Sequence, residues 1–192
     1  MWQEWDYKIF FLINRDFVHP WLDAFFPWWT DFQKTPVFWG LLPLLLIGVW
    51  WKGRGRALGV LLMAFLVASI ADIISAEMIK PLFERSRPEF SEMASQVLVR
   101  GPSAGGFSFP SSHALDAFAL VAFLISFYPR GRWYFLGIAL LTAYSRVYCG
   151  LHFPSDVLGG ALLGFLFGFS MAEIWKRFLF FAKKRVGKES EL

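Results

Sequence analysis

The sequence predicts an all-α integral membrane protein, a bundle of five or six transmembrane helices. The 192-residue chain is 56% hydrophobic and 20% aromatic, which exceeds the apolar share of most soluble domains. Its apolar residues are gathered in five blocks, each long enough or nearly long enough to span a bilayer: 36–51, 57–78, 114–128, 133–148 and 157–181. A soluble protein with buried core helices is disfavoured, because five such blocks leave little polar face for water.

The whole chain, residues 1–192, is expected to form a single membrane domain. Residues 1–35 are rich in aromatic side chains but are interrupted by prolines and acids. They are predicted either to lie in the membrane interface or to make an imperfect first span. The stretch 79–112 is predicted to be an extracytoplasmic loop, and residues 183–192 a cytoplasmic tail.

Basic residues are distributed unevenly between the two ends of the predicted helices. Two hairpins, 52–56 and 129–132, together with the segment from Lys176 onward hold 11 of the 19 Lys and Arg. Because basic loops favour the cytoplasm, this end is expected to face inward, and the loops 79–112 and 149–156 to face outward. The net charge of +4 comes without a basic cluster on a soluble fold, so nucleic acid is not an expected partner.

Three polar clusters lie at the outward ends of the predicted helices, and the topology brings them to one membrane face. The clusters are Lys80 with Arg87, then Ser111, Ser112 and His113, and finally Ser145, Arg146, His152 and Asp156.

The cations and serines in these clusters suit a phosphate group. Lys80, Arg87 and Arg146 supply positive charge, and guanidinium groups can grip phosphate oxygens in pairs. Ser111 and Ser112 precede a predicted helix, whose free backbone N–H groups favour an anion.

The two histidines supply groups for proton transfer or nucleophilic attack. Asp156 follows Pro154 in the first turn of the last predicted helix. From there it can accept a hydrogen bond from one nitrogen of His152 and leave the other nitrogen reactive. The set predicts displacement at phosphorus at one membrane face, where positioning and charge stabilisation do most of the work.

The spacing of these residues resembles the three signature motifs of the type 2 phosphatidic acid phosphatase superfamily of membrane lipid phosphatases. The resemblance covers residues 80–156 and rests on Lys80 and Arg87-Pro88, on Pro110-Ser111-Ser112-His113, and on Ser145-Arg146, His152 and Asp156. The second motif usually has Gly where Ser112 stands here. Because the family uses a backbone N–H at that place, Ser112 retains the required group.

The resemblance implies a role for each residue. His152 would attack phosphorus and form a phosphohistidine, Asp156 would orient His152, and His113 would protonate the leaving oxygen. The phosphoryl oxygens would be held by Lys80, Arg87, Ser111, Ser112 and Arg146. No metal and no cofactor are implied.

Two further residues are expected to support the site. Ser145 is kept as a secondary site residue, although a small buried serine also suits helix packing. Asp116 lies three residues after His113, so the two would share a helix face and Asp116 could tune His113.

The resemblance also implies a substrate class and a location. The substrate would be a lipid phosphomonoester or pyrophosphate: lipid A 1-phosphate, undecaprenyl diphosphate, phosphatidylglycerol phosphate or phosphatidic acid. The first two lead, because an outward-facing site suits lipids of the cell envelope. The expected location is the bacterial cytoplasmic (inner) membrane, with several spans and the site facing the periplasm or the exterior. The bilayer and its lipid would be the partners, and no obligate protein partner is inferred.

Two alternatives remain open at this point. One is a lipid phosphotransferase that uses the same phosphohistidine. The other is a non-catalytic lipid-binding or transport protein of the same fold.

Other conspicuous residues are assigned structural roles. Arg85 and Arg100 are expected to be interfacial anchors. Gly160 and Gly164 are four residues apart and are expected to pack helices within the chain. Asp72 lies inside an apolar block, and the sequence identifies no partner for it.

Overall fold

The computed structural model describes residues 2–102 and 105–189, and it is helical with no strand in that part of the chain. The α-helices are α1 (Trp2–Phe11), α2 (Pro20–Thr30), α3 (Pro36–Trp51), α4 (Gly55–Ile74), α5 (Lys80–Phe83), α6 (Ser112–Phe127), α7 (Arg132–Tyr148) and α8 (Pro154–Glu189). Two π-helical turns, η1 (Leu12–Asp16) and η3 (Ser75–Ile79), follow α1 and α4. Short 3-10 turns cover Phe32–Lys34 (η2), Pro88–Phe90 (η4), Ala94–Gln96 (η5) and Pro129–Gly131 (η6).

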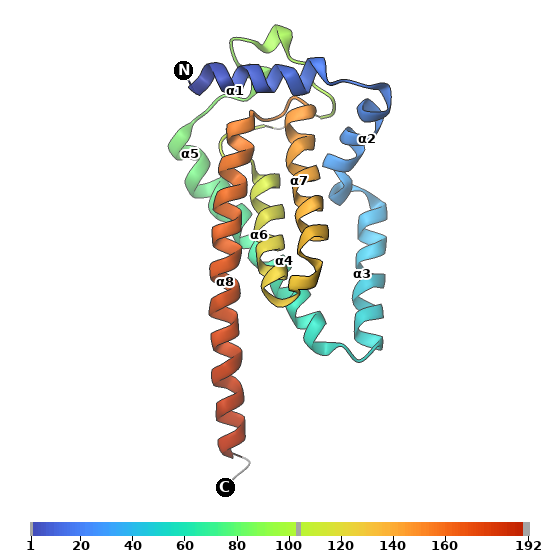
Figure 1. Ribbon diagram of the computed structural model, residues 1–192, viewed down its shortest axis with the longest axis vertical. Helices are drawn as coiled ribbons and strands as arrows, with labels where there is room; N and C mark the ends of the chain where they lie inside the picture. The colour runs from blue at the N-terminus through green and yellow to red at the C-terminus, as the bar shows by residue number, and fades with distance from the viewer. Residues whose placement is uncertain (1, 103–104, 190–192) are drawn as a thin grey trace.

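Each of the five predicted apolar blocks forms a helix of the bundle, namely α3, α4, α6, α7 and α8 (Figure 1). Among the described residues, the helical stretches Gly55–Phe90 and Pro154–Phe181 are long and apolar enough to cross a membrane. The helices α3 and α6 are shorter but also apolar.

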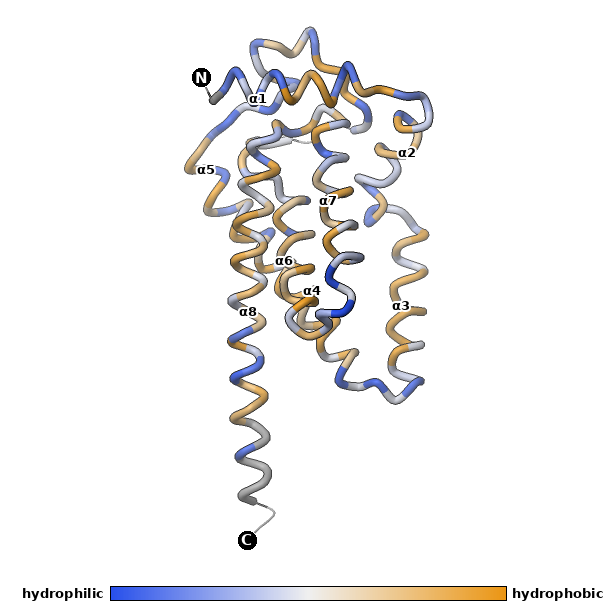
Figure 2. Tube along the Cα trace, in the orientation of Figure 1, coloured by the Kyte–Doolittle hydropathy of each residue, from blue (hydrophilic) through white to orange (hydrophobic). Residues whose placement is uncertain are grey.

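The connections between helices divide into two groups at opposite ends of the bundle. The α3–α4 and α6–α7 connections lie at one end, where α8 also extends toward the C-terminus (Figure 1). The segment 84–111 and the α7–α8 connection lie at the other end. Figure 2 shows hydrophilic residues gathered at both ends and hydrophobic residues along the helices between them. The three polar clusters therefore share one end, as predicted.

The N-terminal segment contributes to the same end. Helix α1 lies across the bundle rather than along it (Figure 1). Helix α2 has 11 residues, fewer than the roughly 20 that a helix needs to span a bilayer. It begins with His19 as N-cap, whose Nδ1 accepts the backbone N–H of Trp21 at 3.2 Å.

The second helical block extends further than predicted. The π-helical turn η3 follows α4 directly, and α5 continues the helix to Phe83, where Glu84 adopts φ 45°. Pro81 cannot donate a backbone hydrogen bond, and the wider turn before it accommodates this defect. Lys80 therefore lies on a helix and not in a loop that begins at residue 79.

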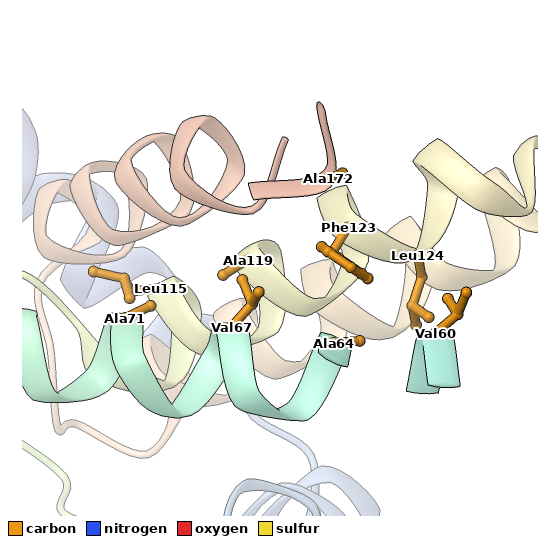
Figure 3. Close-up of a cluster of buried hydrophobic side chains, with 9 residues drawn as sticks. All are labelled: Val60, Ala64, Val67, Ala71, Leu115, Ala119, Phe123, Leu124 and Ala172. Carbon is orange, nitrogen blue, oxygen red and sulfur yellow. The ribbon is translucent and has the colours of Figure 1, made fainter. Parts of the chain in front are cut away.

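The core of the bundle lies between α4, α6 and α8 (Figure 3). One face of α4 presents small or branched residues at helical spacing to α6, and α8 closes the cluster with a single alanine. The buried members are Val60, Ala64, Val67, Ala71, Leu115, Ala119, Phe123, Leu124 and Ala172.

Helix α8 packs directly against the backbone of α6 through glycines four residues apart. A Cβ atom would lie 2.5 Å from the carbonyl oxygen of Ser111 if built on Gly160, and 2.1 Å from that of Leu115 if built on Gly164. Gly168 repeats the contact against Ala119. The predicted use of Gly160 and Gly164 in packing within the chain is confirmed.

Replacing Gly164 with alanine is expected to lower the melting temperature of the detergent-purified protein. The added methyl group must push α8 away from α6, and such overpacking costs about 1–3 kcal/mol. Gly137→Ala in α7 is the matched control, since nothing lies within 4 Å of a Cβ atom at that position. Equal melting temperatures for the two variants would contradict the close helix contact.

Candidate active site

A tight turn after α7 fixes the backbone of His152. Gly150 has φ +78°, and a Cβ atom there would lie 2.7 Å from the carbonyl oxygen of Leu98, so glycine is required on both counts. The carbonyl of Arg146 then accepts the backbone N–H groups of Leu151 at 3.1 Å and His152 at 3.3 Å. The end of α7 therefore carries His152 directly.

The start of α8 fixes Asp156. Pro154 is the first helical residue, where no N–H donor is needed. The Oδ2 atom of Asp156 accepts the N–H of Phe153 at 2.8 Å, as one half of a capping box. The backbone carbonyl of Asp156 accepts the N–H of Ser111 at 3.0 Å, which ties α8 to the start of α6.

The neighbours of His152 define the protonation of its ring. Its Nε2 lies 3.0 Å from Nη1 of Arg87, and its Nδ1 lies 3.4 Å from the Ser108 hydroxyl. Because a guanidinium can only donate, Nε2 carries the lone pair and Nδ1 carries the proton in the neutral ring. Ser108 donates to Oδ2 of Asp156 at 2.6 Å, so its oxygen is free to accept from Nδ1.

The contact between His152 and Asp156 differs from the prediction. Nδ1 and Oδ2 are 3.7 Å apart, an ion-pair distance rather than the direct hydrogen bond expected from the sequence. The hydroxyl of Ser108 contacts both groups, at 3.4 Å from Nδ1 and 2.6 Å from Oδ2. Asp156 orients His152 in this structure chiefly through Ser108.

Burial of His152 lowers the pKa of its ring to about 3, because an enclosed site disfavours the imidazolium. We expect the ring to be the neutral Nδ1–H tautomer at pH 5.5, in contrast to an ordinary histidine with a pKa near 6.5. Histidine-selective ¹⁵N NMR in detergent can test this, since the chain has three histidines and His152→Ala assigns the signal. An imidazolium signal from His152 at pH 5.5 would contradict the burial.

The same lowered pKa affects stability with a definite sign. The unfolded chain binds the His152 proton below about pH 6.5, whereas the native protein does not bind it until about pH 3. This residue therefore lowers the free energy of unfolding as the pH falls through that window.

Arg87 is held rigidly beside His152. Its side chain is buried and donates to the carbonyl oxygens of Leu151 at 3.0 Å, Gly106 at 3.1 Å and Gly105 at 3.2 Å. These bonds draw on all three guanidinium nitrogens, and Nη1 also contacts His152. The segment after residue 87 thus folds back to position the cation.

Arg146 and Ser111 present polar atoms that suit an anionic ligand. Nη1 of Arg146 donates to the Thr30 hydroxyl at 2.7 Å. Its Nε, and the buried Oγ of Ser111, have no hydrogen-bond partner in the part of the chain that the structure describes. Such atoms are costly when buried, and a phosphate oxygen would satisfy both. Lys80 begins α5, which lies at the same end of the bundle (Figure 1).

His113 lies at the start of α6, one residue after Ser112, which is the first residue of that helix. Its Nε2 is 2.8 Å from Nε2 of Gln33, in the turn between α2 and α3. Ser111, two residues before His113, donates its backbone N–H to the carbonyl of Asp156 at 3.0 Å, so the start of α6 lies beside the start of α8. The structure therefore brings both motif histidines and the three cations to one site.

The two secondary residues differ in their hydrogen bonding. The buried hydroxyl of Ser145 donates to the carbonyl of Thr142 at 2.6 Å, within its own helix. The Oδ1 atom of Asp116 is buried and has no hydrogen-bond partner in the described part of the chain, so its influence on His113 stays a prediction.

The expectation that Arg85 and Arg100 are interfacial anchors is wrong. Arg85 lies 2.5 Å from a carboxylate oxygen of Asp156 and 2.5 Å from one of Asp6. Arg100 pairs with Asp23 and donates to two backbone carbonyls. Sequence reasoning had one signal for Arg85, its position two residues before Arg87 in the first motif.

Three other contacts at the site were not predicted. Ser108 joins His152 to Asp156, Thr30 holds Arg146, and Gln33 holds His113. Two of them come from the N-terminal segment, whose distance along the chain from the motifs gave no indication of contact.

Two histidines and three cations lie at one end of an apolar helical bundle, an arrangement typical of a membrane protein and suited to an anionic ligand. The profile of the PAP2 superfamily matches residues 60–179, and the chain belongs to this superfamily, as its motifs predicted.

Similar proteins with assigned names support the same superfamily assignment. A lipid A 4′-phosphatase from Bacteroides thetaiotaomicron is 35% identical over 152 residues, which are 72% of this chain and 66% of that protein. An undecaprenyl-diphosphatase from Sulfolobus acidocaldarius is 36% identical over 124 residues, which are 63% of this chain and 57% of that protein. The matched part thus spans somewhat less than two thirds of each relative.

Two solved structures share the fold. LpxE from Aquifex aeolicus has a TM-score of 0.61 and 30% identity, over 84% of this chain and 90% of that one. A transmembrane PAP2-type phosphatidylglycerolphosphate phosphatase from Bacillus subtilis has a TM-score of 0.63 and 28% identity, over 91% and 86%. The predicted fold class, an all-α membrane protein, is confirmed.

Proposed function

We propose that this protein is a membrane lipid phosphate phosphatase that works through a phosphohistidine on His152. The observation that carries the proposal is the protonation and hydrogen bonding of the His152 imidazole. Its Nε2 lone pair faces Arg87, its Nδ1 proton faces Ser108 and Asp156, and burial keeps it neutral. A neutral imidazole with one nitrogen fixed as donor is a prepared nucleophile.

The first chemical step forms the bond between His152 and phosphorus. Nε2 gives up its hydrogen bond from Arg87 and attacks phosphorus, the bond from phosphorus to the lipid oxygen breaks, and a proton from His113 goes to that oxygen. Arg87, Arg146 and Lys80 stabilise the charge on the phosphoryl oxygens, as expected for a reaction governed by electrostatics. Ser111 and the backbone N–H of Ser112 lie at the helix N-terminus that faces the same group.

The second step releases phosphate. Water attacks the phosphohistidine and gives its proton to His113, the bond from Nε2 to phosphorus breaks, and inorganic phosphate leaves. His113 thereby recovers the proton that it gave to the lipid oxygen. Gln33 occupies Nε2 of His113 in this structure, so a bound lipid would take the place of that amide if Nε2 delivers the proton.

We propose lipid A phosphates and undecaprenyl diphosphate as the leading substrates. Relatives carry these names, and one of them is a lipid A 4′-phosphatase, so the 4′-phosphate joins the 1-phosphate as a candidate. The basic connections lie at the end of the bundle opposite the site, which supports an inner-membrane protein with its site facing outward.

Phosphate release by the detergent-purified protein tests this function. The lipids are lipid A with defined 1- and 4′-phosphates, undecaprenyl diphosphate, phosphatidylglycerol phosphate and phosphatidic acid, each assayed in EDTA. We expect inorganic phosphate from at least one lipid, undiminished by EDTA. Phosphorylated acceptor without free phosphate would identify a phosphotransferase. Failure with every lipid, and no phosphoenzyme, would favour a non-catalytic lipid-binding protein.

A further inference from the structure

We infer that Asp6 and Arg85 are positioning residues for His152. Helix α1, which carries Asp6, therefore contributes to catalysis and not only to the fold. The inference rests on the proposed function of His152. Asp6 lies outside residues 60–179, the part of the chain that matches the superfamily profile. Neither residue is one of the motif positions on which the resemblance rests.

Asp6 is bound to the first turn of α8. Its Oδ1 accepts the backbone N–H of Ser155 at 2.8 Å, and its Oδ2 accepts the Ser155 hydroxyl at 2.6 Å and Nη2 of Arg85 at 2.5 Å. The side chain is 3% exposed. Burial of a carboxylate is costly unless it is paired and hydrogen-bonded, and these three contacts meet that requirement. Asp6 is thus fixed in place and not a solvated residue of an interfacial helix.

Arg85 connects Asp6 to Asp156. Nη2 contacts Asp6, while Nη1 contacts Oδ1 of Asp156 at 2.5 Å and the Ser155 hydroxyl at 2.6 Å. The guanidinium also lies over the ring of Phe153, 4.4 Å from its centroid. Because the guanidinium is a rigid planar fork, fixing one end fixes the direction of the other.

Asp156 in turn helps to fix the orientation of the His152 ring. With Oδ1 held by Arg85, Oδ2 is directed toward Ser108, the N–H of Phe153, and Nδ1 of His152. Asp156 is fully buried, so Arg85 also supplies the counter-charge that keeps it ionised. Loss of Asp6 would let Arg85 rotate, and the acceptor for the Nδ1 proton would lose its fixed direction.

The expected kinetic signature is a loss of turnover without a loss of binding. Arg85 directs its Nη groups at two carboxylates and a serine, whereas the phosphate site is made by Lys80, Arg87 and Arg146. Asp6→Asn keeps the shape and removes the charge. We expect kcat to fall about 10- to 100-fold, by analogy with the loss of residues that orient metal-binding histidines, with KM changed less than about twofold. Arg85→Gln should lose more than Arg85→Lys, which retains a charge.

A matched control comes from the same helix. Glu4 is exposed on α1, and Glu4→Gln is expected to leave kcat unchanged. Coupling is tested in an Asp156→Asn background, where Asp6→Asn should cause no further loss, because its effect passes through Asp156. Unchanged kcat in Asp6→Asn, or a loss that adds fully to that of Asp156→Asn, would overturn the inference.

A readout independent of activity separates this inference from the proposed function. In ¹⁵N NMR spectra, the Nδ1–H signal of His152 should shift and broaden in Asp6→Asn and Arg85→Gln, because its acceptor loses its fixed direction while Arg87 still donates to Nε2. If the natural sequence releases no phosphate, the proposed function fails, and this spectral change still decides whether Asp6 positions His152. An unchanged His152 signal would refute the inference. If Asp6→Asn does not fold, Arg85→Lys compared with Arg85→Gln provides the same test.

Discussion

Replacing His152 with alanine is expected to reduce phosphate release by about 10⁴-fold or more, because no other group supplies the attacking lone pair. The loss should appear in kcat, since the cations that would bind phosphate remain. Rapid mixing with a ³²P-labelled lipid, followed by an alkaline quench, should trap a labelled protein only when His152 is present, since phosphohistidine survives base and is lost in acid.

His19→Ala is the control for this experiment. His19 is exposed at the start of α2 and is not among the residues that surround His152. This variant should retain both activity and the labelled intermediate. Labelled protein in His152→Ala, or equal turnover in the two variants, would remove His152 as the nucleophile.

Replacing Arg87 with lysine is expected to reduce kcat/KM by about 10²- to 10³-fold, even though the charge is retained, by analogy with the loss of a preorganised donor. The guanidinium of Arg87 meets three carbonyl oxygens and Nε2 of His152 at once. An ammonium group has no planar fork and cannot serve all four. Two effects then combine, a misplaced phosphate cation and a nucleophile without its fixed tautomer.

Arg130→Lys is the matched control, since Arg130 is exposed in the turn at the opposite end of the bundle. Kinetic assays and melting temperatures should be measured together for both variants. Arg87→Lys is expected to lose activity far out of proportion to any loss of stability. Activity within about threefold of the starting protein would show that positive charge alone suffices at residue 87, contrary to the role of the fork.

The helices could be predicted from the sequence because their signal is local. Each block is a continuous apolar run, and its limits lie close to those of the helix observed. The exceptions are the ends of the second and last blocks. The turn η3 and α5 carry the second helix to Phe83, and α8 continues to Glu189, so residues 183–189 of the predicted tail are helical. The loop was predicted to begin at residue 79, just before Lys80, although the helix continues there through a π-helical turn.

The motif residues of the site could be predicted because their spacing is distinctive, and the structure brings the histidines and cations together. The supporting residues could not. Asp6 and Arg85 are separated by 79 residues, and Thr30 and Arg146 by 116. Nothing local distinguishes Asp6 from any other acid of an amphipathic helix. The anchor prediction for Arg85 failed for the same reason, because both of its carboxylate partners are distant in sequence.

The site lies at one end of the helical bundle, and this location determines how the rate of a lipid phosphatase must be described. A lipid whose headgroup reaches that end can keep its chains within the leaflet. Enzyme and substrate then meet by diffusion in two dimensions, and the relevant concentration is the surface density of the lipid. The Michaelis constant becomes a mole fraction, so inert lipid added to the same vesicle slows the reaction, whereas more vesicles of the same composition do not restore it.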